Sequence, residues 1–355
     1  MKKLSCLCLA FLFLLGCAAG CSSNPPADTT ASESTASEAT EVTQSPEEAA
    51  VFKVLMIGQS LAQDTVWLLY DVLKAEMPDK EFLVADIYDS ITLGDHRINI
   101  LTNYAVYDYI VNKDGKMVTT KNYTITAALK DQQWDLIIFN DATYPTTQAA
   151  EFKDGDHDFM IKHIAENAAP GYKLAYNATW ANPTSAGLYA PERRQPPANF
   201  RENFFGRFQG SRNEYYRLIS ENIKTYIETD TRYDYVFHSG TAIQYASETH
   251  GVPEADPTRV YDLYRDYVHL SDFGRLIVAY QLYAQIFGLE ELTQVNVNLI
   301  PQAMRATARE QAFGNLTITD THKQAIIASV NYALQNPNTE PPQTFRPAAT
   351  LEPLS

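Results

Sequence analysis

Short apolar, β-rich runs alternate with helical patterns along most of this chain. The first run spans residues 51–57 and ends at Gly58, and helically spaced apolar residues follow over residues 66–73. Strands joined by crossover helices are the repeating units of open α/β sheets. The alternation predicts an α/β fold, a three-layer α/β/α sandwich around a mainly parallel sheet. Further strands are expected at 82–87, 134–139, 172–176 and 235–237, a hairpin at 112–115, and helices at 125–130, 159–167 and 214–228.

Composition divides the chain into four parts. In residues 1–21, Lys2 and Lys3 precede an apolar run that is too short to span a bilayer and is typical of a signal peptide. Residues 22–50 are rich in Ser, Thr and Glu and predict a disordered tether, because they cannot bury enough apolar surface to offset chain entropy. Residues 51–335 predict one large globular domain, and residues 336–355 a proline-rich tail.

One stretch interrupts the alternation within the predicted domain. Residues 181–212 are rich in proline, glycine and arginine. Long loops of this kind in compact domains are often lids or binding loops. We therefore expect a lid-like insertion beside the strand that ends near Trp180, although a solvated loop would have the same composition.

The four cysteines predict how the chain is attached to the cell. All of them lie in residues 1–21, so the rest of the chain can form no disulfide. The run Leu14-Leu15-Gly16-Cys17 resembles the bacterial lipobox, in which the signal is cut before a cysteine that then carries a lipid. Cys21 is an alternative lipidation site, and ordinary cleavage after small residues stays open. We expect an exported protein that is lipid-anchored to the bacterial cell surface.

The formal charge of −15 limits the partners. It argues against nucleic acid and against an anionic bilayer surface, since either would favour a basic patch. Membrane contact is therefore expected through the lipid anchor only, and the sequence does not fix the oligomeric state. No metalloprotease, phosphate-loop or dinucleotide motif is present, so no cofactor and no metal are expected. Asp154, Asp156 and Asp158 have calcium-like spacing, but the loop lacks the glycine and the final carboxylate of such sites.

Three residues could form a catalytic triad. Ser60 lies where the first strand gives way to a helix, and Asp266-x-x-His269 stands far downstream. A serine hydroxyl is a weak nucleophile unless a base takes its proton and a carboxylate orients that base. Taken singly, Ser60 and Asp266 could each be helix caps, and His269 an ordinary surface histidine.

Three blocks of sequence resemble the SGNH hydrolases, also called GDSL-like esterases and acylhydrolases. They are Gly58-Gln59-Ser60-Leu61, Asn140-Asp141 and Asp266-Tyr267-Val268-His269, in that order. The likeness is greatest to a branch with a Gly-x-Ser first block. It implies an SGNH/flavodoxin-like sandwich, with Ser60 as nucleophile, His269 as general base and acid, and Asp266 as its partner.

The resemblance also implies an oxyanion hole. Its donors would be the backbone N–H groups of Ser60 and Ser90 and the side-chain amide of Asn140. Two positions depart from the family pattern, because Ser90 stands where the second block usually has glycine and Ile138 replaces the glycine two residues before Asn140. A glycine does follow the second block, at Gly94.

Three further residues are candidates for lining the substrate site. His96 follows the second block and could bind substrate or be structural. Asp141 follows Asn140, and the pair could also be a simple turn. Trp180 could stack on a sugar or belong to the core.

These observations predict a surface-anchored serine esterase that hydrolyses acyl esters, with acetyl esters of carbohydrate as the expected substrates. The substrate could be a small molecule or a polysaccharide. The alternative is a lipoprotein that keeps the SGNH fold and binds glycan without turnover. The departures at Ser90 and Ile138 and the 22 tyrosines motivate this alternative.

Overall fold

The computed structural model describes residues 50–89, 92–182, 212–249, 263–264, 268–299 and 318–341. The chain divides into residues 1–47 and 48–355, and every described residue belongs to the second unit. The predicted signal peptide, nearly all of the predicted tether and the bulk of the insertion therefore lie outside the described residues. So do both lipidation candidates.

A seven-stranded sheet forms the centre of the fold, in the order β4-β3-β2-β1-β5-β6-β7. Strands β2, β1, β5, β6 and β7 are parallel, and β3 and β4 extend the β2 edge as antiparallel neighbours. The parallel part has the strand order of flavodoxin-like sheets. The predicted α/β sandwich around a mainly parallel sheet is confirmed. The strands are β1 Phe52–Gly58, β2 Phe82–Tyr88, β3 Tyr107–Lys113, β4 Lys116–Tyr123, β5 Leu136–Phe139, β6 Lys173–Asn177 and β7 Tyr235–Phe237.

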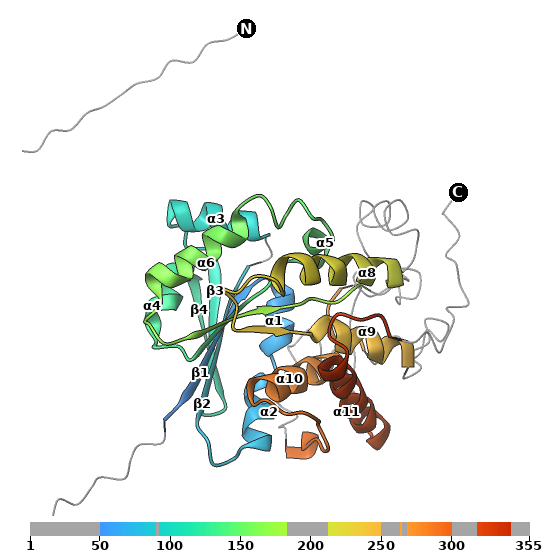
Figure 1. Ribbon diagram of the computed structural model, residues 1–355. Helices are drawn as coiled ribbons and strands as arrows, with labels where there is room; N and C mark the ends of the chain where they lie inside the picture. Colours follow the sequence, from blue (N-terminus) through green and yellow to red (C-terminus); the bar gives the residue numbers. More distant parts are fainter. Residues whose placement is uncertain are drawn as a thin grey trace, which may run out of the picture. The chain divides into compact units, whose positions relative to one another are not determined.

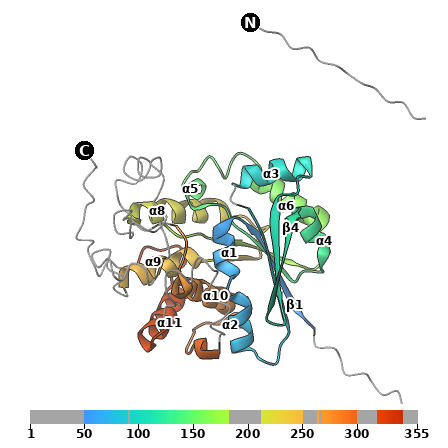
Figure 2. The ribbon, with the colours of Figure 1, turned by 180° about the vertical axis from the view of Figure 1, so that it is seen from behind.

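Helices cover both faces of this sheet. Figure 1 shows α4 and α6 on one side of the strands and α2 and α10 on the other, and Figure 2 shows the same layers from behind. Helices α9 and α11 pack against α10. The helices are α1 Ser60–Val66, α2 Leu69–Glu76, α3 Leu93–Thr102, α4 Ile125–Asp131, α5 Thr143–Thr146, α6 Asp156–Asn167, α8 Arg212–Asn222 continued by the π-helix η2 Ile223–Ile227, α9 Ser239–Thr249, α10 Asp272–Ile286, the 3₁₀-helix η4 Val297–Leu299 and α11 Asp320–Gln335.

Strand β1 is buried on both faces. Leu55 and Ile57 belong to the apolar cluster that includes α4 and α6, whereas Val54 and Met56 belong to the cluster that includes α1 and α2. Successive side chains of a strand point to opposite faces, and a parallel strand covered on both faces is apolar throughout. This burial explains the continuous apolar run that predicted the strand.

The local sequence predicts the β3–β4 turn correctly, but it does not predict every helix or every helix end. The β3–β4 hairpin turns at Asp114 and Gly115, which both have positive φ, as a two-residue turn between twisted strands requires. The helical pattern expected over residues 66–73 is divided, because α1 ends at Val66 and α2 begins at Leu69. The structure also contains α3, α9 and α11, which the sequence patterns did not predict.

The predicted tail begins too early. Asn338 is buried, its backbone N–H donates to Thr241 Oγ1 at 3.0 Å, and its Nδ2 donates to Glu228 Oε1 at 2.6 Å. The packed part of the chain therefore continues past residue 335, the boundary expected from composition. The remaining tail, residues 342–355, lies outside the described residues.

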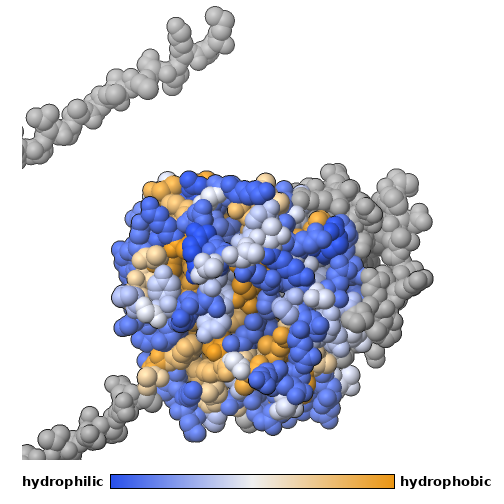
Figure 3. Space-filling view, in the orientation of Figure 1, coloured by the Kyte–Doolittle hydropathy of each residue, from blue (hydrophilic) through white to orange (hydrophobic). Residues whose placement is uncertain are grey.

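The surface is mostly polar. Hydrophilic residues cover most of the face in Figure 3, with smaller apolar areas between them. The large apolar side chains exposed within the described ranges are Ile98, Leu101, Tyr104 and Val118. No helix in those ranges is long and apolar enough to cross a membrane.

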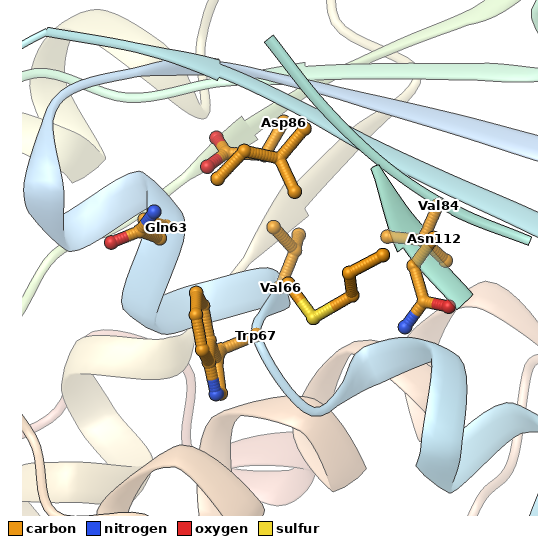
Figure 4. A pocket seen from close by; sticks show the side chains of 8 residues that line it. Gln63, Val66, Trp67, Val84, Asp86 and Asn112 are labelled. Atoms are coloured by element: carbon orange, nitrogen blue, oxygen red, sulfur yellow. The ribbon is translucent and has the colours of Figure 1, made fainter. Parts of the chain in front are cut away.

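A buried carboxyl group lies in the middle of the sheet. Asp86 on β2 is 5% exposed, and neither of its oxygens has a hydrogen-bond partner among the described residues. It lines a hollow of about 20 Å³, shown in Figure 4, between the sheet and Trp67. Burial, and to a lesser extent the carboxylates of Asp64 and Asp108, raises the pKa of Asp86 well above its usual range. Burial therefore favours the neutral form of this carboxyl group.

We predict that this group makes the protein less stable as pH rises. The pKa of Asp86 is higher in the folded than in the unfolded chain, so its contribution is complete below the unfolded pKa and is lost as pH rises through the folded one. Asp86→Asn cannot ionise, and its Tm relative to wild type should increase from pH 4 to pH 8 in thermal unfolding experiments. The exposed Asp79→Asn variant is the control for loss of one charge. A Tm difference that is constant with pH would contradict the assignment.

Candidate active site

The sheet brings two of the predicted blocks together. Strand β1 lies between β2 and β5, and the chain crosses to opposite sides of β1 to form them. Ile57 pairs with Phe139, so the turn after Gly58 lies beside Asn140. Ligands of open α/β sheets bind at such a switch point, outside the carboxyl ends of the strands.

Ser60 is the first residue of α1, but it does not cap the helix. The cap is Gln59, whose side-chain oxygen accepts the backbone N–H of Leu61 at 2.7 Å. Ser60 Oγ instead lies 2.8 Å from His269 Nε2. In the tautomer with its proton on Nδ1, His269 accepts a hydrogen bond from the Ser60 hydroxyl, which is the arrangement of a nucleophile and its base.

The backbone on either side of His269 is held in place. Trp180 Nε1 donates to the Val268 carbonyl at 3.1 Å, and the Leu270 N–H donates to Asp64 Oδ2 at 2.9 Å. His269 itself is only 8% exposed. The backbone that carries the imidazole is therefore held by Trp180, which follows β6, and by Asp64 on α1.

Asn140 offers an unused hydrogen-bond donor beside the serine turn. It is 1% exposed, and within the described ranges neither its Nδ2 nor its Oδ1 has a partner. Its side chain lies against Gly58, where an added Cβ would be 2.5 Å from Asn140 Oδ1. Any residue larger than glycine would therefore collide there. A buried amide without partners is costly, and a donor reserved for a developing negative charge is what an oxyanion hole requires.

A pocket of about 310 Å³ opens beside Ser60. Most of the described side chains around it carry a hydroxyl, amide or carboxyl group. Asn182 is one of them, and its buried Oδ1 has no partner within those residues. Sequence reasoning missed Asn182, although its place shortly after a strand end was a usable signal. The described residues that line the pocket are Gln59, Ser60, Leu61, Thr92, Asp95, Ala142, Thr143, Tyr144, Asn182, Tyr215 and Val268.

The structure thus brings Ser60 and His269 into contact and places Asn140 next to the serine turn. Asp266 and Ser90 lie outside the described residues. The third member of the predicted triad and the second-block oxyanion donor therefore stay predictions.

Two of the predicted substrate-lining residues are core residues instead. Trp180 is fully buried, so it offers no face to a sugar, and its role is to hold Val268. His96 is 1% exposed and contacts Tyr107, with Nδ1 2.8 Å from the hydroxyl oxygen. Burial lowers the pKa of His96 to about 4, so it is neutral.

Asp141 also turns away from the pocket. It is 4% exposed and accepts the backbone N–H groups of Leu93 at 3.3 Å and Ala142 at 2.7 Å. Burial raises its pKa to about 7, although the two backbone donors oppose this shift. Asp141 therefore ties the start of α3 to the end of β5, and it does not line the pocket as we had predicted.

The acidic residues with calcium-like spacing have other partners. Asp154 accepts the backbone N–H of Asp156, Asp156 pairs with Arg97 at 2.9 Å, and Asp158 pairs with Arg232 at 2.7 Å. In the part of the chain that the structure describes, no three His, Cys, Asp or Glu side chains are grouped to hold a metal ion.

Residues 53–312 match a family described as a domain of unknown function, DUF4886. This chain belongs to the DUF4886 family. A solved DUF4886 protein from Bacteroides uniformis is 22% identical, with a TM-score of 0.60 over 82% of this chain and 98% of that one, and so shares the fold. A sequence search of curated proteins finds no match.

Two further structures are less similar to this DUF4886 chain, each with a TM-score of 0.40 over 67% of it. One is a protein from Slackia heliotrinireducens proposed to be an SGNH hydrolase, 16% identical over 100% of its own chain. The other is a gut microbial diltiazem-metabolizing enzyme, 13% identical over 48% of its chain.

Proposed function

We propose that this DUF4886 protein is a serine esterase that hydrolyses acetyl esters of carbohydrate at the bacterial cell surface. The contact of 2.8 Å between Ser60 Oγ and His269 Nε2 carries the proposal. A cap or a surface histidine would not produce this contact, since Gln59 caps the helix and His269 is buried.

In the first half of the reaction, Ser60 Oγ attacks the ester carbonyl while His269 Nε2 takes the hydroxyl proton. The carbonyl π electrons move onto the oxygen and return when the bond to the sugar oxygen breaks. His269 gives its proton to that leaving oxygen. In the second half, water attacks the acyl-serine with the same base, and acetic acid and free Ser60 are released. Asp266 is proposed to orient the imidazole.

Charge on the carbonyl oxygen needs donors that are already in place. The unpartnered Nδ2 of Asn140 and the Ser60 backbone N–H, at the start of α1, are the proposed donors. The backbone N–H of Ser90 is the proposed third donor. No metal is needed for this chemistry.

The pocket favours a small polar ester over a long acyl chain. Its volume of about 310 Å³ is at the low end for ligand sites. The buried Oδ1 of Asn182 is an acceptor that a sugar hydroxyl could satisfy. A pocket of this volume leaves little room for a long fatty acyl chain.

Replacing the nucleophile should abolish activity. Ser60→Ala should lower kcat for 4-nitrophenyl acetate, and acetate release from acetylated xylan, by about 10⁴-fold or more, because no other group accepts the acyl chain. A fluorophosphonate probe should label wild type at Ser60 and leave the variant unlabelled. Ser247→Ala, a serine on α9 that bonds the Ile243 carbonyl, is the matched control and should keep full activity. An unlabelled but folded wild type would instead support the glycan-binding alternative.

Removing the proposed oxyanion donor should slow the chemical step. We expect Asn140→Ala to lower kcat about 10²- to 10³-fold with little change in KM, because the donor acts on charge that develops in the transition state. Asn112→Ala is the matched control, since it also truncates a buried strand amide with an unpartnered oxygen, but on β3. Equal kcat values for the two variants would remove Asn140 from the mechanism.

The anchor rests on the sequence of residues 14–17. If Cys17 carries the lipid, Cys17→Ser should abolish incorporation of a radiolabelled fatty acid in bacterial cells and release the protein from the membrane fraction. Cys21→Ser should do neither. The reverse pattern would identify Cys21 as the lipidated residue, and no incorporation in wild type would indicate ordinary cleavage.

A further inference from the structure

A buried ion pair connects the helix that begins with Ser60 to the backbone next to His269. Asp64 on α1 is fully buried, and Arg275 on α10 is 1% exposed. Asp64 Oδ1 accepts Arg275 Nε at 3.0 Å and Nη2 at 2.8 Å, while Oδ2 accepts the Leu270 N–H at 2.9 Å. One carboxylate therefore joins α1, α10 and the segment that carries His269.

We propose that the pair of Asp64 and Arg275 positions the nucleophile and the base of this enzyme relative to each other. The inference rests on the proposed function. Neither Asp64 nor Arg275 is among the described residues that line the pocket, so we assign both as positioning residues.

The short covalent path between the carboxylate and each reacting group supports this role. Asp64 follows Ser60 by four residues, which places the two side chains one turn apart on the same face of α1. Leu270 follows His269 directly, so the Oδ2 bond fixes the peptide next to the imidazole. A displacement of Asp64 would therefore change the separation of Ser60 Oγ and His269 Nε2.

Arg275 keeps the carboxylate in place. It approaches from α10, and its guanidinium lies 5.0 Å from the ring centre of Trp67, the residue that follows α1. Its Nη1 also lies 3.6 Å from Asp272 Oδ1. Because Arg275 bonds Oδ1, the carboxylate is oriented with Oδ2 toward the Leu270 N–H. This orientation defines the direction of the hydrogen bond between Leu270 and Asp64.

A role in stability alone explains the pair less well. Removing two charges from water is costly, and apolar residues of similar size often replace buried ion pairs at no loss of stability. An apolar pair would fill the same space but could not hold the Leu270 N–H. The directional bond is what the ion pair adds.

The double variant Asp64→Leu/Arg275→Met tests this role without leaving an unpaired buried charge. We expect kcat to fall about 10²-fold with KM unchanged, because small misplacements of reacting groups cost rates of that size. The rate of fluorophosphonate labelling at Ser60 should fall in parallel. Asp64→Asn, which keeps an oxygen for Leu270 but loses the charge, should give an intermediate kcat.

Tyr280→Phe is the matched control on the same helix. It removes a partly buried 2.7 Å bond between α10 and Glu76 on α2 and should lower Tm without lowering kcat. A double variant with wild-type kcat would overturn the inference. So would a Tyr280→Phe variant whose kcat falls as far, since destabilisation alone would then explain the loss.

Hydrogen exchange tests the bond on the wild-type protein and so does not depend on whether a variant folds. The Leu270 amide should exchange as slowly as the central amides of β1, and the double variant should lose this protection. Fast exchange at Leu270 in wild type would overturn the inference. Full activity of Ser60→Ala would overturn the proposed function instead, so the two failures can be told apart.

Discussion

The pairing of β1 with a parallel strand on each side determines where everything else lies. Strands β2 and β5 lie on opposite sides of β1. After β1 the chain therefore crosses to one side to form β2, and it later crosses to the other side to form β5. The register that pairs Ile57 with Phe139 then places Gly58 against Asn140. The apolar side chains of β1 pack against both helical layers and hold the strand in the centre of the fold.

Two hydrogen bonds from different elements hold the segment that carries His269. One starts at the end of β6, where Trp180 is buried and bonds the Val268 carbonyl. The other starts at α1, where Asp64 bonds the Leu270 N–H. Val268 and Leu270 are the two neighbours of His269, so the residue between them has little freedom. A segment more than 200 positions from Ser60 can thus place its imidazole within hydrogen-bond distance, 2.8 Å from the hydroxyl oxygen.

Sequence patterns locate residues whose chemistry is local, but they leave open the role of residues whose function depends on burial. Strand patterns, the Asp114-Gly115 turn and the Gly-x-Ser, Asn and His blocks can be read along the chain, and the structure puts Ser60 against His269. For Trp180 and His96 the sequence left both a binding role and a structural role open, because aromatic and imidazole side chains serve in either. Only the fold shows that other elements enclose them. Helices such as α9 and α11 were missed because they pack against other helices, so tertiary contacts define their buried sides.

Asp86 and Asn140 are buried polar groups that differ in whether protonation can lower the cost of their burial. Asp86 and Asn140 both lack hydrogen-bond partners within the described residues, and both are at most 5% exposed. Asp86 lies within β2 and can shed its charge by taking up a proton, which its raised pKa reflects. An amide does not titrate, so the free-energy cost of burying the Asn140 amide without a partner persists in the free protein. Because Asn140 lies beside the serine turn, the proposed mechanism lets an oxygen of the substrate supply the missing acceptor, and this interaction would favour the transition state.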